Sequence, residues 1–168
     1  MKLSFLKMRT RHLLKKNKTS RANVPYKQAN QVGIIFSVED KAKHDAVKEL
    51  IKKFEHDGKH VQVIEFLPTK KENYEFLFDF FTEKDLSFWG NLTSHNALTF
   101  ADTPFDFMYY IDQEPNPYIL HLLARSKAKC RVGKFWKDGE PYFELMIEST
   151  QGMKVLMDEM YKYTCALK

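Results

Sequence analysis

The sequence predicts an α/β fold, a Rossmann-like three-layer sandwich around a mostly parallel sheet of five or six strands. Residues 31–38 and 105–111 are continuous apolar runs, which are typical of strands buried on both faces. Segments with helical periodicity alternate with such runs, and this alternation indicates βαβ units. A chain of 168 residues suffices for one domain of this kind.

The first βαβ unit lies between residues 31 and 68. The run "QVGIIFSV" (31–38) predicts a strand, and "HVQVIEFLP" (60–68) predicts the next one. Between them, residues 39–58 have the spacing of an amphipathic helix that Gly58 ends. The apolar face of this helix consists of Ala42, Ala46, Val47, Leu50, Ile51 and Phe54.

A second unit follows after residue 104. Residues 105–111 and 129–135 predict strands, and the helix between them begins near Pro117, a favoured first-turn residue. A further strand is expected within 141–149 and a terminal helix within 152–168. Residues 94–104 suggest a brief turn or helix.

The segment from residue 69 to 92 is the least regular part of the body. We expect a short strand near Leu86–Trp89. The segment is rich in aromatic residues, which could stack on nucleic-acid bases, but few basic residues are interleaved with them. Core packing is therefore the expected role of the cluster Tyr74, Phe76, Phe78, Phe80, Phe81, Phe88 and Trp89.

Charge divides the chain into a basic arm with its connector, residues 1–30, and a single α/β domain, residues 31–168. Of the 27 basic residues, nine precede Glu39, the first acid, which leaves 18 basic against 22 acidic residues in the remainder. Such asymmetry suggests a polyanionic partner for the arm. Pro25 marks an irregular connector.

Three interpretations of the arm remain open. The first is a non-catalytic binding or adaptor protein that contacts RNA, the ribosome included, without DNA specificity. Its phosphate contacts would be Lys7, Arg9, Arg11, Lys15, Lys16 and Lys18. The second is attachment to an anionic membrane surface through Leu6, Leu13 and Leu14, which share one arc of a helical wheel. The third is a solvated tail that promotes solubility.

Polar residues follow the predicted strands where ligands bind in open α/β sheets. The rival interpretation of the chain is therefore a protein that binds a small ligand or a nucleotide sugar, or an enzyme, with its site at Ser37, Asp40, Asp112 and Gln113. Asp40 and Asp112 would be facing carboxylates, one of which needs a raised pKa for acid–base work. Alternatively, Asp40 caps its helix and Asp112 lies near the start of the next one.

Several classes of function are disfavoured. No GxGxxG or GxxxxGK[ST] motif follows the first strand, and "SVEDKAK" has two acids and no glycine, so dinucleotide binding in the usual mode is excluded. We expect no catalytic residue, metal site or cofactor. Cys130 and Cys165 lack CxxC spacing and indicate a reduced, cytoplasmic protein. The N-terminus is not a signal peptide.

Two resemblances accompany these patterns. "FDFMYYIDQ" (105–113) and "AKCRVG" (128–133) resemble a strand end and a following strand in the N-terminal Rossmann half of lipopolysaccharide heptosyltransferases. On this resemblance, Asp112, Gln113, Arg131 and Gly133 match the acceptor-half pattern, but a second domain for the donor is lacking. The basic start with "VGII", "WG" and "ARSKAKCRVG" resembles a small bacterial domain family without an assigned activity. Together the two resemblances imply a Rossmann-like fold for this chain, and they argue against glycosyl transfer by this chain alone.

Overall fold

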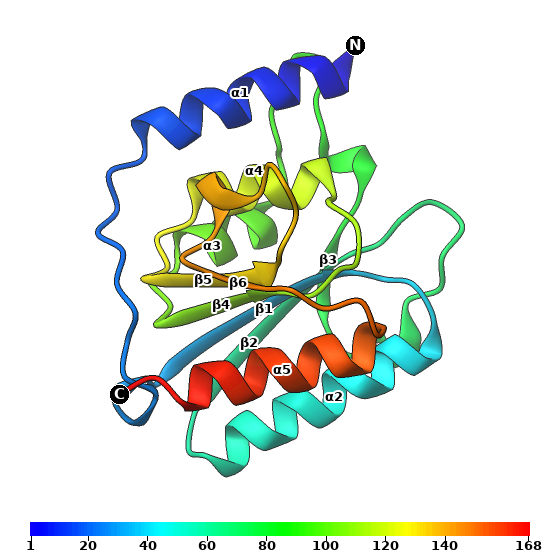
Figure 1. Cartoon of the computed structure of the whole chain (residues 1–168). Helices are drawn as coiled ribbons and strands as arrows, with labels where there is room; N and C mark the ends of the chain where they lie inside the picture. Colours follow the sequence, from blue (N-terminus) through cyan, green and yellow to red (C-terminus); the bar gives the residue numbers. More distant parts are fainter.

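The computed structural model describes all 168 residues and contains one six-stranded parallel sheet (Figure 1). The strands are β1 (Gln31–Ser37), β2 (His60–Phe66), β3 (Asp79–Phe81), β4 (Phe107–Tyr110), β5 (Cys130–Lys134) and β6 (Leu145–Ile147). The helices are α1 (Lys2–Lys16), α2 (Lys41–His56), α3 (His95–Asp102), α4 (Pro117–Arg125) and α5 (Met153–Cys165). The order β3-β2-β1-β4-β5-β6 is that of a Rossmann-like sheet, which confirms the predicted fold class.

The two central strands are buried on both faces, as their continuous apolar runs predict. All four residues of β4 are buried, and so are the five inner residues of β1. They pair in parallel, with Val32 opposite Phe107 and Ile35 opposite Tyr110. Since the strand order reverses between β1 and β4, their carboxyl ends border the crevice in which ligands bind in this class of fold.

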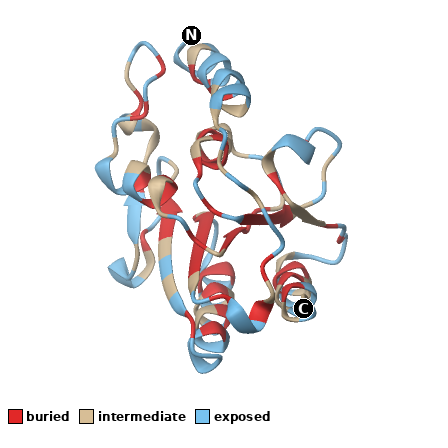
Figure 2. Ribbon diagram, turned by 90° about the vertical axis from the view of Figure 1, so that its left-hand side faces the viewer, coloured by how far each residue is buried: buried red, intermediate tan, exposed pale blue.

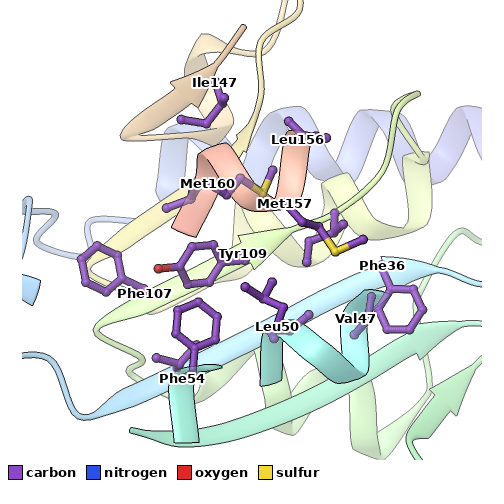
Figure 3. Packing of buried hydrophobic residues seen from close by; sticks show 14 of the residues in the cluster. Phe36, Val47, Leu50, Phe54, Phe107, Tyr109, Ile147, Leu156, Met157 and Met160 are labelled. Carbon is purple, nitrogen blue, oxygen red and sulfur yellow. The ribbon is translucent and has the colours of Figure 1, made fainter. Parts of the chain in front are cut away.

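Helices α2 and α5 cover one face of the sheet and enclose the larger of the two cores (Figure 3). The ring of Phe54 from α2 lies 5.0 Å from that of Tyr109 from β4. The hydroxyl of Tyr109 is buried too, and it donates a 2.8 Å hydrogen bond to Thr164 of α5. The polar tip is thus satisfied, as burial in an apolar core requires.

Helices α3 and α4 cover the opposite face, and α1 forms an additional layer outside α4 (Figure 1). Leu6 of α1 is fully buried in the same cluster as Leu122 and Leu123 of α4. The rest of α1 is mostly exposed (Figure 2). The basic segment at the N-terminus is therefore an ordered helix packed on the domain.

The connector after α1 runs along the edge of the sandwich from one helix layer to the other (Figure 1). Asn17 begins it by donating from Nδ2 to the carbonyls of Ala124 and Ser126, at 2.9 and 3.0 Å. Val24 and Tyr26 are then buried in the core beneath α2 and α5. Residues 1–30 thus contribute to both cores.

Residues 69–92 differ most from expectation. The predicted strand near Leu86–Trp89 is wrong, because the strand of this segment is β3, and Leu86 forms only an isolated antiparallel bridge to Leu92. Gly90, with φ of 75°, allows the tight turn between them. We call residues 86–92 the aromatic loop. Of the two possibilities for residues 94–104, a brief turn or a helix, the structure has the helix, α3.

The expected core role of the aromatic cluster is also wrong for several of its members. Phe81 is buried, but Phe76, Phe88 and Trp89 are 83%, 54% and 60% exposed. Strand β3 has only three residues and lies at the sheet edge, and the exposed aromatic residues lie in the irregular segments before and after it. None of the five helices is long and apolar enough to span a bilayer.

Candidate nucleic-acid interface and strand-end crevice

Helix α1 presents exposed cations on both flanks of its buried face, and no acidic side chain neutralises them. It contains no Asp or Glu, and Leu6 and Thr10 are its only buried residues. The exposed cations of this helix and of the residue pair that follows it are Lys2, Lys7, Arg9, Arg11, Lys15, Lys16 and Lys18. None of them belongs to any ion pair in the molecule. Their charge is therefore available to a partner.

The distribution of charge in α1 is not what the stability of the helix requires. Lys15 and Lys16 in the last turn complement the helix dipole, but the first turn has Lys2 and no acid, and Met1 makes no side-chain cap. Cations near the N-terminus of a helix are unfavourable. The charges of α1 therefore depart at its N-terminal end from the pattern that stabilises a helix.

A buried polar pair holds α1 to the domain. Thr10 Oγ1 donates to the Leu6 carbonyl at 2.8 Å and lies 3.0 Å from Nδ1 of His121 in α4. Because the hydroxyl hydrogen is used on Leu6, His121 donates from Nδ1, and its Nε2 is the nitrogen without a proton. Burial lowers the pKa of His121 to about 4, so the ring is neutral at physiological pH.

The aromatic loop is fixed directly against α1. Arg9 Nε donates to the Trp89 carbonyl at 3.0 Å, and the rings of Phe5 and Trp89 lie 5.6 Å apart. At Gly90 a Cβ atom would come within 2.5 Å of Phe5 Cβ and 2.6 Å of the Leu6 nitrogen. Only glycine permits this approach, so the exposed aromatic residues and the basic helix form one surface.

The crevice at the strand ends is built around Asp112, which is buried at the end of β4. The Ser37 backbone N–H and hydroxyl donate to its two oxygens at 2.9 and 2.7 Å. Lys43 Nζ donates to Asp112 Oδ1 at 2.6 Å and to the Ser37 carbonyl at 2.7 Å. Asn116 Nδ2 donates to Ser37 Oγ at 2.9 Å. The predicted residues Ser37 and Asp112 are thus brought into direct contact.

The other two predicted site residues have separate partners. Asp40 Oδ1 accepts from the Lys43 backbone N–H at 2.8 Å, which confirms the alternative in which Asp40 is a helix cap. Gln113 Oε1 accepts from Lys134 Nζ at 2.9 Å. Asp40 and Asp112 therefore accept from different groups of Lys43, its backbone N–H and its Nζ, and no hydrogen bond joins the two carboxyl groups.

The crevice has a volume of about 490 Å³ and an acidic character. The charged side chains that line it are Glu39, Lys43, Glu83, Asp112 and Glu114. Four carboxylates against one lysine repel the phosphates of a nucleotide. This arrangement suits a neutral or cationic ligand better than a sugar nucleotide.

One group of potential metal ligands lies apart from both sites. The ligand atoms of His44, Asp45 and Glu75 lie within 4.8 Å of one another. However, both oxygens of Glu75 accept from Lys48 at 3.0 Å, and Asp45 accepts from Lys41 at 3.2 Å. The ammonium groups of Lys41 and Lys48 therefore already pair with the two carboxylates that a metal ion would need.

Sequence reasoning missed Lys43 and Asn116 in the crevice and His121 beneath α1. Asn116 had a signal, because Asn before Pro117 is a common start of a helix, and it does cap α4 through the Tyr118 N–H. For Lys43 and His121 the sequence contains no such signal. Each meets a partner 69 or 111 positions away in the chain.

Residues 2–167 match the model of a family of unknown function, DUF6913. The chain belongs to this family. The match includes α1 and the connector as well as the sheet, and it agrees with the resemblance to a bacterial domain family without an assigned activity. No curated protein and no solved structure matches the chain. The likeness of residues 105–135 to heptosyltransferases therefore rests on its motifs alone.

Proposed function

We propose that this protein is a non-catalytic, cytoplasmic RNA-binding adaptor in which α1 supplies the phosphate contacts. The observation that supports the proposal is the set of exposed cations on both flanks of α1, none of which has an acidic partner. The contacts we name are Lys7, Arg9, Arg11, Lys15, Lys16 and Lys18. Ribosomal RNA is the expected target, because it is the most abundant RNA in a cell.

The physical basis of binding is the release of counterions from the RNA. Each phosphate that a lysine or arginine neutralises frees condensed cations, which makes the affinity fall steeply as salt rises. A helix of 15 residues is about 22 Å long, enough for several successive phosphates. Because α1 is already packed on α4, its cations are positioned before the RNA arrives, which lowers the entropic cost of binding.

The test is a charge variant of the full chain. Lys7, Arg11, Lys15, Lys16 and Lys18 are replaced by Gln, and Arg9 is kept because it holds the aromatic loop. The control replaces five other exposed lysines without ion pairs by Gln: Lys52, Lys70, Lys71, Lys162 and Lys168. Both variants lose the same charge, so only the position of the charge differs between them.

Binding to ribosomes and to a labelled RNA is measured by cosedimentation and anisotropy over a range of salt concentrations. The α1 variant should lose affinity, and its salt slope should become shallower by about 0.7 for each lost contact to a single strand. Equal affinities of the two variants would overturn the proposal. Deletion of residues 1–30 is a poor substitute, because it removes Leu6, Val24 and Tyr26 from the cores.

A small-ligand function for the crevice is the second candidate. The buried Asp112–Lys43 pair and its link to Ser37 at the strand-order reversal favour it. A neutral or cationic metabolite from a panel that also contains sugar nucleotides should then raise the melting temperature of the protein. A panel without any shift would count against this candidate and would leave the RNA proposal untouched.

Membrane attachment through the leucine arc has less support than either. Leu6 is fully buried against α4, and Leu13 and Leu14 are only partly exposed. Insertion of this arc into a bilayer would require α1 to leave the domain and expose the core beneath it. Anionic vesicles are accordingly a control in the experiments on RNA.

A further inference from the structure

A groove lies between α1, the aromatic loop and helices α3 and α4. Its volume is about 540 Å³, within the range of small-molecule pockets. Half of its lining is apolar and half is polar, and no acidic residue contributes to it. The polar half consists of Arg9, His12, Asn91, His121 and Arg125. An uncharged, flat molecule with polar edges would match this composition.

Two polar groups of the groove are free for a ligand. His121 uses Nδ1 on Thr10, and no protein group hydrogen-bonds its Nε2, which is a bare acceptor on the neutral ring. The Asn91 side-chain amide, a donor and an acceptor, has no protein partner either, because the residue bonds only through its backbone. The edge of a nucleobase offers both complements: its N–H groups can donate to His121 Nε2 or Asn91 Oδ1, and its carbonyl or ring nitrogen can accept from Asn91 Nδ2.

The exposed aromatic side chains stand beside this groove. Phe88 and Trp89 are more than half exposed, and their rings lie perpendicular to each other, 5.0 Å apart. Every base has a flat face that can stack on such a ring, whereas base edges need hydrogen bonds. Cations that could contact the RNA backbone stand on the same flank of α1. Arg9 lines the groove, and Lys2 and Lys16, each seven positions away from it, lie on the same side of the helix.

We propose that the groove and the aromatic loop bind unpaired bases of single-stranded RNA while the sugar–phosphate backbone follows α1. This inference rests on the RNA-binding function proposed above and narrows its target to unpaired segments. In a duplex the bases are stacked and paired, so Phe88 and Trp89 would have no free face to contact.

The polar lining favours a base over a lipid chain. An acyl chain in the groove would leave His121 Nε2 and the Asn91 amide without hydrogen bonds, and burial of unpaired polar groups is costly. The flanking cations would attract an anionic membrane as well as RNA. Vesicles therefore belong in the test as a separate arm.

The experiment compares a 12-nucleotide single-stranded RNA with a fully paired hairpin of equal phosphate number, closed by a non-nucleotide linker so that it has no unpaired base, by anisotropy at fixed salt. The test variant is Phe88→Ala/Trp89→Ala, in which both side chains are already exposed. The matched control is Phe76→Ala/Tyr163→Ala, two exposed aromatic residues of the α2–α5 side. Asn91→Leu removes the free amide at similar size. Circular dichroism and urea unfolding verify that each variant is folded.

We expect tighter binding of the single strand than of the hairpin, and a loss of about tenfold or more in the Phe88/Trp89 variant. The salt slope should stay unchanged, since stacking releases no counterions. The control and the affinity for the hairpin should not change. Asn91→Leu should lower the affinity for the single strand and leave the affinity for the hairpin unchanged.

Two results would overturn the inference. One is equal affinity for the single strand and the hairpin, with no effect of Phe88→Ala/Trp89→Ala. If the α1 charge variant still loses affinity in that case, the protein binds RNA but has no site for bases. The other is binding of anionic vesicles, but not RNA, that depends on Trp89. If both the aromatic variant and the α1 charge variant bind RNA as tightly as the original protein, both proposals are wrong.

Discussion

Thr10 of α1 and His121 of α4 share a buried contact of 3.0 Å, although 111 positions separate them in the chain. The contact joins the most basic segment of the protein to its apolar core. The same histidine lines the groove under α1. Consequently, changes that loosen α1 should affect both the stability of the domain and its affinity for RNA.

Replacement of Thr10 by Val tests how firmly α1 is held. Valine has the same shape but leaves Nδ1–H of His121 unpaired in the core, which should lower the free energy of unfolding by about 1–3 kcal/mol. Urea unfolding measures the change. Thr69→Val, at an exposed position without a side-chain hydrogen bond, serves as control and should stay within about 0.5 kcal/mol. Equal effects would mean that the Thr10 contact contributes nothing.

Two glycines with positive φ allow a controlled test of how the aromatic loop packs against α1. Gly58 (φ 81°) has open space where a Cβ would stand, whereas at Gly90 (φ 75°) the atom would meet the backbone of α1. Gly58→Ala should cost only the penalty of the left-handed conformation, about 1–2 kcal/mol. Gly90→Ala should cost more and also weaken RNA binding, because the loop must leave α1. Similar stabilities of the two variants would contradict this account.

The Asp112–Lys43 pair predicts a double-mutant cycle. Lys43 has a side chain 4% exposed, so Asp112→Asn leaves a buried charge without its main partner, at a cost of about 3–5 kcal/mol. Lys43→Met in addition should recover a large part of that loss. Thermal and urea unfolding of the four proteins give the coupling energy. Strictly additive single effects would show that the pair is not an energetic unit.

Glu65 on β2 predicts an unusual pH dependence. It is buried, and its Oε1 has no hydrogen-bond partner, so desolvation raises the pKa of this carboxyl to about 7 from an ordinary value of 4.5. Between pH 4.5 and 7 the unfolded state releases the proton and the folded state keeps it. The free energy of unfolding therefore falls as the pH rises through this window.

Glu65→Gln should remove this fall, because glutamine does not titrate. At pH 8 the variant should be more stable than the original protein by up to about 3 kcal/mol, and at pH 4.5 nearly equal. Urea unfolding at both pH values measures the difference. Glu55→Gln, at an exposed position of α2, is the control. A Glu65→Gln variant that is equally destabilised at both pH values would refute the role of desolvation.

Much of the fold could be predicted from the sequence. The apolar runs at residues 31–38 and 105–111 predict buried parallel strands, and both are central strands of the sheet. Within the crevice, the position of Ser37 and Asp112 at strand ends predicts that they lie close together, and they are hydrogen-bonded. The short strand β3 escaped prediction, since three residues carry almost no periodicity.

The sequence by itself determined the type and approximate position of most elements, and the excess of positive charge before Glu39. Periodicity and charge are properties of neighbouring residues, so they can be read locally. Only the tertiary structure decided the strand order, the packing of α1 through Leu6 and Thr10, and the exposure of Trp89. These depend on which distant surfaces exclude water from one another, and such partners are chosen by the folded chain as a whole.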